Sequence, residues 1–443
     1  MSIANVLLVH GYSVRDFKSY GQYSALLAEA LNLTPSQVFV SAFDSLNNQV
    51  TCDDLSRALE LRIKRLEQAR LIDISNCALL CHSTGSIIAR RWILDRLNKG
   101  QACPSHFVSL AGANHGSTVA QLGETQLVQF GRQIFQGSSV GLNILSDLDY
   151  GSKFLLRLNR EWINAQALGA FKTYIFSLIG DKYGANAPLL PSSMPVFWQV
   201  KEKGSDATVR ISGSNLNYRM FSRDFSEVDP QDQILSTPDT AHLILPGYSH
   251  TGTDGILERA ASMTDNAFQA VLAALNVSNS SQYQTLINKW NSLNDAWSNT
   301  STPQKLVNST VVFNISVPGT QELTDFVITI QDGSGNARNI SSAILDHQPT
   351  QNSTNKSSLT FYLDYSAFNA SHPHMLNIEV HNSYDKMQYR SVDVVIPAAL
   401  AQLVRPNQCT YVELVLDESS FHILPSNDPA VTDATRWPPL PGI

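Results

Sequence analysis

A serine in a short turn carries the strongest chemical signal in this sequence. Residues 81–85 read Cys-His-Ser-Thr-Gly and place Ser83 between an apolar, strand-like segment and a segment with helical character. This is the setting of a G-x-S-x-G nucleophile elbow, where small residues beside the serine let the strand and helix backbones approach closely. Cys81 occupies the first small position, where glycine is usual. We interpret Ser83 as a nucleophile; the alternative is an ordinary strand-to-helix turn.

A serine nucleophile needs a base and an acid, because neutral serine is a weak nucleophile. In hydrolases with this elbow, the chain order is serine, then aspartate or glutamate, then histidine. His250 follows the last β-rich segment of the first half of the chain and is the predicted base. Asp206, in a turn before a β-rich step, is the preferred acid, and Asp181 is the alternative. The carboxylate would hold the imidazole in one tautomer and stabilise the cation that forms.

The segment His10-Gly11-Tyr12 directly follows the first apolar strand-like run. In this architecture the loop there supplies a backbone N–H that stabilises a developing oxyanion, together with the N–H of the residue after the nucleophile. We therefore predict Tyr12 and Thr84 as the oxyanion donors, and we expect His10 to fix the loop by hydrogen bonding. Supporting rather than proton-transferring roles are also predicted for His82, His115 and His242.

Strands and helices within the first 300 residues must position these side chains. Short β-rich runs alternate with helical patterns, which indicates a parallel sheet covered on both faces. The predicted strands are residues 5–9, 38–41, 76–81, 106–110, 172–179 and 241–245. Leu55, Leu59, Ile63 and Leu66 recur at helical spacing and predict an amphipathic crossover helix. The fold class that follows is α/β, with an α/β-hydrolase parallel sheet.

Two further regions complete the predicted organisation. Residues 117–170 are too long for one crossover and too apolar for a solvated loop, so they form either a helical cap or an extra packed helical layer. Residues 301–443 form a second domain with an apolar tail, predicted as an antiparallel β-sandwich. Its predicted strands are residues 310–317, 325–331, 358–365, 375–381, 389–396 and 411–416.

Composition excludes several classes of protein. The 443 residues are 43% hydrophobic and 16% charged, with a net charge of −7 and no basic run, so nucleic acid is not an expected partner. Five cysteines without paired C-x-x-C spacing indicate reduced thiols, and we expect no metal and no cofactor. No run approaches the roughly 20 apolar residues of a membrane-spanning helix, and no basic region precedes residues 6–9, so no signal peptide is expected either.

Taken together, these motifs resemble a bacterial α/β-hydrolase lipase, and most closely the PlaB-like phospholipase A family. That family also has a serine in a His-Ser-Thr-Gly elbow without the first glycine, and a β-rich domain of comparable size after its hydrolase domain. The resemblance covers most of the chain and rests on motifs in the first half and on architecture in the second. It implies phospholipase A and lysophospholipase activity, peripheral membrane association without a spanning helix, and self-association into a homo-oligomer.

Two other functions remain open at this point. A neutral-glyceride lipase or small-ester carboxylesterase would use the same three residues, because the scissile ester is the same. A non-catalytic surface-binding protein on a hydrolase fold would require a broken triad, whereas all three positions are filled. With no basic patch, membrane contact would depend on apolar groups such as Trp437, Leu440 and Ile443 in the tail, or on the cap.

Overall fold

The first half of the chain forms one parallel sheet. The computed structural model describes residues 3–12, 22–41, 45, 47–117, 120, 141–183, 202–259, 262–300, 305–318, 323–324, 326–332, 334, 338–345, 349–371, 373–380, 392–395 and 400–416. Its six strands are β1 (Asn5–Val9), β2 (Val38–Ser41), β3 (Cys77–His82), β4 (His106–Leu110), β5 (Tyr174–Gly180) and β8 (Ala241–Leu245). They lie in the order β2-β1-β3-β4-β5-β8, and all neighbours are parallel. Each predicted strand of this sheet is confirmed.

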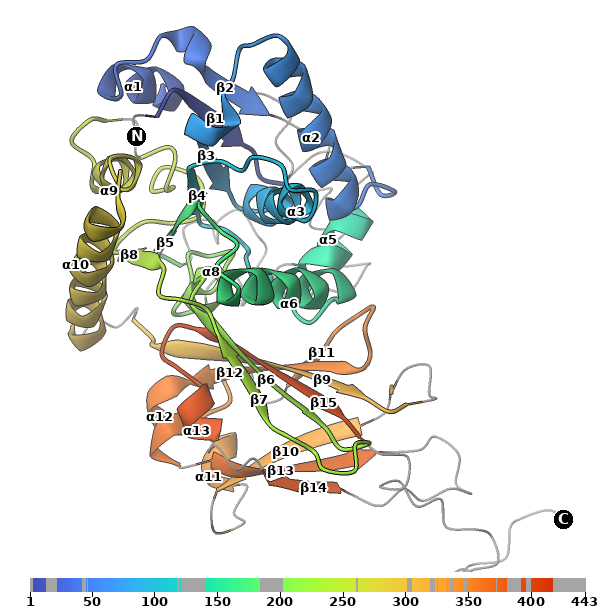
Figure 1. The fold of residues 1–443 in the computed structure, drawn as a ribbon. Helices are drawn as coiled ribbons and strands as arrows, with labels where there is room; N and C mark the ends of the chain where they lie inside the picture. The colour runs from blue at the N-terminus through green and yellow to red at the C-terminus, as the bar shows by residue number, and fades with distance from the viewer. Residues whose placement is uncertain are drawn as a thin grey trace, which may run out of the picture.

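Helices cover both faces of this sheet, because the side chains of each strand alternate between two cores. Leu7 and Val9 face a core shared with α2 (Cys52–Gln68), α3 (Gly85–Asn98) and α6 (Lys153–Ala167). Val6 and Leu8 face a second core shared with α1 (Tyr23–Ala30), α9 (Asn266–Leu275) and α10 (Ser280–Asn299). Figure 1 shows α9 and α10 on one side of the strands and α2 and α3 on the other.

Helix α2 illustrates how local sequence sets these elements. The Thr51 side chain accepts a hydrogen bond from the Asp54 N–H, and the Asp54 carboxylate accepts one from the Thr51 N–H, which forms a capping box at the first turn. The predicted apolar stripe of this helix is buried against the sheet at Leu55, Leu59, Ile63 and Leu66. The capping box and the apolar stripe therefore both favour the same helix.

The predicted cap is described only in part. Helices α5 (Leu142–Leu148) and α6 belong to a packed layer, since Phe154, Leu158 and Trp162 are buried in the same core as α3. Residues 118–119 and 121–140, the rest of that segment, lie outside the described residues.

Two further sheets, built mainly from the second half of the chain, pack face to face. One has the strands β10 (Phe326–Asp332), β13 (Pro373–Val380) and β14 (Val392–Val395) in that order. The larger has the order β11-β12-β9-β15-β6-β7. Its strands are β6 (Tyr218–Asp224), β7 (Gln233–Ser236), β9 (Asn308–Ser316), β11 (Thr350–Gln351), β12 (Ser358–Asp364) and β15 (Cys409–Val415). One apolar core fills the space between the two sheets.

The larger sheet differs from the predicted antiparallel sheet in two ways. It is mixed, because β15 runs parallel to both β9 and β6. The hairpin β6–β7 comes from the first 300 residues, yet it pairs with β15, and Figure 1 shows these green strands beside the orange and red ones. Pairing with β6 covers an edge of β15 that would otherwise leave backbone N–H and C=O groups unpaired. Contacts between residues so far apart in the sequence have no local signal.

The two halves share an apolar core. Val312 and Tyr362 of the larger second sheet belong to the same buried cluster as Trp162 of α6 and Val209. Neighbouring residues such as Val311 and Phe361 point to the opposite face, into the core between the two second-half sheets. The larger sheet therefore has two buried faces, and one of them packs on the first half of the chain.

Candidate active site

Ser83 lies at the carboxyl end of β3, in the sharp turn before α3. Its φ of 54° is in the left-handed region that a residue with a side chain adopts only under constraint. The Ser83 N–H donates to the carbonyl of Leu110 at 3.0 Å, which ties the turn to β4. A methyl group at Gly85 would lie 2.5 Å from the Val9 carbonyl oxygen, so only glycine fits there. The predicted strand-turn-helix around Ser83 is therefore present, with fully buried Cys81 at the strand position.

The structure brings Ser83, His250 and Asp206 together in one hydrogen-bonded chain. The distance from His250 Nε2 to Ser83 Oγ is 3.0 Å, and that from His250 Nδ1 to Asp206 Oδ2 is 2.8 Å. The His250 backbone N–H also donates to the Asp206 carbonyl at 2.8 Å. These residues come from three separate turns, and Asp206 is fully buried.

A tight turn fixes the carboxylate of Asp206. Its second oxygen, Oδ1, accepts the backbone N–H groups of Thr208 at 3.0 Å and Val209 at 2.8 Å. Ala207, within the turn, has a φ of 82°. With Oδ1 bound to the backbone, Oδ2 is aimed at His250, so the carboxylate can hold the imidazole with Nε2 toward Ser83.

The alternative acid, Asp181, has different partners. Asp181 Oδ1 accepts the Gly247 N–H at 2.6 Å, and Oδ2 accepts the Trp297 indole N–H at 2.8 Å. Both carboxylate oxygens thus join the turn after β8 to α10. Asp181 has a structural role there, and the structure places Asp206 rather than Asp181 on His250.

The predicted oxyanion loop lies directly against Ser83. A methyl group built on Gly11 would be 2.8 Å from Ser83 Cβ, so this glycine allows the loop to approach the serine. Tyr12 follows it, and burial raises the pKa of the Tyr12 hydroxyl. Thr84 is the N-cap of α3 and directly follows Ser83 in the chain. Both predicted donors therefore neighbour the serine in the chain or in space.

The other histidines are held by structural contacts. The His10 Nδ1 atom accepts the Gly11 N–H at 2.9 Å, as predicted for a loop-fixing residue. His82 Nε2 is 3.2 Å from the carbonyl oxygen of His250. Burial, followed by the neighbouring His250 and His10, holds the pKa of His82 well below its usual value. Burial lowers the pKa of His242 to about 3, and its Nδ1 is 2.8 Å from Ser177 Oγ.

A buried polar network behind the elbow was not predicted from the sequence. Ser86 Oγ donates to the Cys81 carbonyl at 3.3 Å, and Ser109 Oγ donates to Ser86 Oγ at 2.9 Å. The side-chain amide of Asn114 in turn donates to Ser109 Oγ at 3.0 Å. All three polar residues are fully buried, so their hydrogen bonds connect α3 firmly to the end of β4. Small polar residues at strand ends are the signal that could have indicated such a network.

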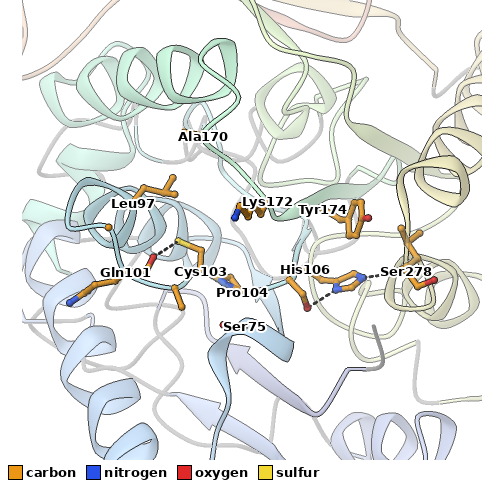
Figure 2. Close-up of a pocket in the computed structure, with 14 residues that line it drawn as sticks. Ser75, Leu97, Gln101, Cys103, Pro104, His106, Ala170, Lys172, Tyr174 and Ser278 are labelled. Carbon is orange, nitrogen blue, oxygen red and sulfur yellow. Dashed lines mark hydrogen bonds between the residues drawn. The ribbon is translucent and has the colours of Figure 1, made fainter.

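A cavity of about 570 Å³ lies at the opposite end of the parallel sheet. Figure 2 shows its lining, which includes Leu97, Cys103, Lys172 and the first residues of β4 and β5, His106 and Tyr174. Ser83 and His250, by contrast, follow the carboxyl ends of β3 and β8, where ligands of open parallel sheets bind. This cavity is therefore separate from the candidate active site.

The described part of the chain contains no group of three or more His, Cys, Asp or Glu side chains that could hold a metal ion. The five cysteines are free thiols, as expected, and burial raises the pKa of each. Among the helices that the structure describes, none is both long enough and apolar enough to cross a membrane.

Comparisons with known proteins show the fold. No protein-family model matches the sequence, and no curated protein matches it. Phospholipase PlaB from Legionella pneumophila matches with a TM-score of 0.80 and 24% identity, over 97% of each chain. Its complex with thio-NAD matches with a TM-score of 0.77 and 23% identity, over 96% of this chain and 97% of that one. A lipase of Bacillus licheniformis, BlEst2, matches 62% of this chain and 93% of its own with a TM-score of 0.41 and 14% identity. Because the likeness to PlaB extends over 97% of the chain, this protein has the fold of PlaB, with an α/β-hydrolase sheet joined to a second β domain.

Proposed function

We propose that this protein is a serine hydrolase that cleaves acyl esters of phospholipids and lysophospholipids through an acyl-enzyme intermediate. The observation that carries the proposal is the hydrogen-bonded chain from Ser83 through His250 to Asp206, with 3.0 Å and 2.8 Å between the paired atoms. The left-handed φ of Ser83 supports it, because that strain presents the hydroxyl above the sheet.

The chemistry follows from this geometry. Ser83 Oγ attacks the ester carbonyl carbon while His250 Nε2 takes the hydroxyl proton. The backbone N–H groups of Tyr12 and Thr84 stabilise the oxyanion of the tetrahedral intermediate. When the intermediate collapses, His250 returns its proton to the leaving alcohol, and a water molecule then repeats the sequence on the acyl-enzyme. Asp206 stabilises the imidazolium in both halves of the reaction.

The lipid substrate is proposed from two lines of support. The His-Ser-Thr-Gly elbow resembles that of PlaB-like phospholipases, and the fold matches a protein named as a phospholipase over 97% of its length. Fatty-acid release should be measured on phosphatidylcholine, phosphatidylglycerol, lysophosphatidylcholine, a monoacylglycerol and a p-nitrophenyl ester. Preference for the phospholipids supports the proposal. Preference for the monoacylglycerol or the small ester would instead identify a neutral lipase or carboxylesterase.

Covalent labelling tests the enzyme class directly. A fluorophosphonate probe should label the wild-type protein and should fail to label Ser83→Ala, because no activated nucleophile remains. Ser75→Ala removes an exposed serine near the amino ends of the strands and serves as the matched control, with labelling unchanged. Equal labelling of all three proteins, or none of the wild type, would contradict the proposal and favour a non-catalytic binding protein.

We further propose peripheral membrane contact and self-association, both resting on the apolar, proline-rich segment 436–443. This segment lies outside the described residues. The net charge of −7 makes electrostatic attraction to anionic lipid weak, so contact would come from apolar side chains. Deleting residues from Thr435 onward should lower activity on lipid aggregates, or change the oligomer size in light scattering, more than it lowers p-nitrophenyl ester hydrolysis. If the truncated protein keeps its oligomer size and its activity on both lipid aggregates and the p-nitrophenyl ester, this proposal is wrong.

A further inference from the structure

We propose that the second domain takes part in catalysis by holding the loop that carries Asp206, and that Asn308 on β9 is a positioning residue for it. The inference rests on the proposed function. It assigns a role in the reaction to a domain in which no sequence motif indicates chemistry.

The carbonyl of Gly204 anchors one end of the loop to β9. The Asn308 side-chain amide donates to that carbonyl at 2.8 Å, and the Ile211 N–H donates to it at 3.0 Å. Gly204 has a φ of 75°, and a side chain at this position would collide with the amide of Asn308. Asn308 is 1% exposed, so this hydrogen bond is shielded from water.

The other end of the loop lies on the neighbouring strand, β12. The Arg210 guanidinium lies over the ring of Tyr362 and forms an ion pair with Glu202. Beyond the loop, Ser212 Oγ is 2.8 Å from Thr310 Oγ1 of β9. Strands β9 and β12 are paired antiparallel, so one rigid sheet supports both ends of the loop.

The loop also contacts the first domain, where Val209 belongs to the same buried apolar cluster as Trp162. Ser117 Oγ donates to the Thr208 carbonyl at 2.8 Å, and the His250 N–H donates to the Asp206 carbonyl. The latter bond belongs to the site itself, and the N–H groups that hold Asp206 Oδ1 move with the loop. A shift of the loop would thus move the carboxylate away from His250 Nδ1. Misplacement of a catalytic group by about 1 Å can cost about 100-fold in rate.

The chain offers a matched pair of variants for a test. Asn355 is also buried, at 4% exposed, and its side-chain amide donates to the Gly151 carbonyl at 2.8 Å. Gly151 has a φ of 76°, close to that of Gly204. Both asparagines therefore donate a shielded hydrogen bond from the second domain to a glycine carbonyl of the first half of the chain, and Asn355 also donates to Asn314 Oδ1 at 3.4 Å. Only the bond of Asn308 reaches the loop of Asp206.

We expect Asn308→Ala to lower kcat on a p-nitrophenyl ester by about 10- to 100-fold, with KM changed less than about twofold. Asn355→Ala should lose a similar amount of thermal stability but keep kcat within about twofold of wild type. The downfield proton resonance of the hydrogen bond between His250 and Asp206 should weaken or shift in Asn308→Ala and stay in Asn355→Ala.

The outcomes separate this inference from the proposed function. If the wild type is active and Asn308→Ala has the same kcat as Asn355→Ala, Asn308 does not position Asp206, but the proposed hydrolase function still holds. A wild type without ester turnover or probe labelling would remove the proposed function, and the proton resonance would still decide whether Asn308 positions Asp206. If Asn308→Ala does not fold, Thr310→Val removes only the hydroxyl bonded to Ser212. A fall in kcat at constant KM is then expected, and an unchanged kcat would overturn the inference.

Discussion

The two six-stranded sheets of this protein contribute to the candidate site in different ways. The parallel sheet carries Ser83 and His250 on short turns at the ends of its own strands, β3 and β8. The mixed sheet contributes no member of the hydrogen-bonded chain, yet its strands β9 and β12 contact the loop of Asp206. Residues with recognisable catalytic chemistry and the residues that hold them in place can therefore lie in separate domains.

The interior of the parallel sheet and the contact between the two halves also bury side chains of different kinds. The central strands of the parallel sheet bury mainly apolar side chains, whose packing is not directional. The contact between the two halves buries polar groups such as Asn308, Thr310, Asn352 and Tyr411. Hydrogen bonds made by buried polar groups are directional and costly to leave unpaired, so they can set the orientation of one half on the other.

Replacing the two candidate acids, one at a time, should produce the largest difference in activity. We expect Asp206→Asn to lower kcat on a soluble ester by up to about 10⁴-fold, because an amide favours the wrong imidazole tautomer. Asp181→Asn should keep most of the activity and lower the melting temperature, because it weakens the bonds to Gly247 and Trp297. Steady-state kinetics and thermal unfolding of the two variants provide the measurements. The reverse ranking would show that the carboxylate bound to His250 in the structure is not the one that acts.

The elbow of the parallel sheet should tolerate less change than its exposed turns. Gly85→Ala would place a methyl group 2.5 Å from the Val9 carbonyl oxygen and 2.7 Å from that of His10. We expect it to destabilise the fold by about 1–3 kcal/mol and to abolish probe labelling of Ser83. Gly100→Ala, where a methyl group meets nothing within 4 Å, should cost only the strain of its φ of 63°, about 1–2 kcal/mol. Chemical denaturation and labelling would compare the two, and equal losses would argue against close backbone approach at the elbow.

A pH-dependent change in stability should be the smallest effect, at the contact between the halves. Burial raises the pKa of Asp149 from 3.8 to about 6, although its carboxylate accepts the Ser353 N–H at 3.0 Å. Since the folded pKa is above the unfolded one, the folded state binds the proton more tightly. This contribution is therefore fully present below about pH 4 and is lost as pH rises through 6.

Asp149→Asn removes that dependence, because the amide is neutral at all these pH values. Between pH 4.5 and 7 the free energy of unfolding of the wild type should fall by about 2 kcal/mol relative to the variant. Urea denaturation of both proteins at the two pH values measures this difference. If the free energies of unfolding of the two proteins differ by the same amount at both pH values, Asp149 is ionised in the folded protein throughout the range.

Much of the parallel sheet was predictable because its signals are local. Runs such as residues 5–9 are apolar on both faces, as strands between two helical layers must be, and each predicted strand agrees with the structure to within two residues at either end. The segments around Ser83 and His250 carry their own turn signals. Strand β6 lacks such a local signal, and its partner β15 lies about 190 residues further along the chain. The mixed character of the second sheet was therefore not predicted.

The fold class and the elbow around Ser83 could be predicted from the sequence, because strands, helices and turns are set by residue types within a few positions of one another. The order of serine, acid and base followed from the chain order that hydrolases with this elbow share. Which carboxylate meets His250 depends on tertiary packing, because Asp181 and Asp206 both follow β5 in the chain and differ in where their turns are held. The contact of Asn308 with the carbonyl of Gly204, 104 residues away, also depends on that packing. Such a contact depends on the packing of two domains, and pairing across that distance leaves no periodic or compositional trace in the sequence.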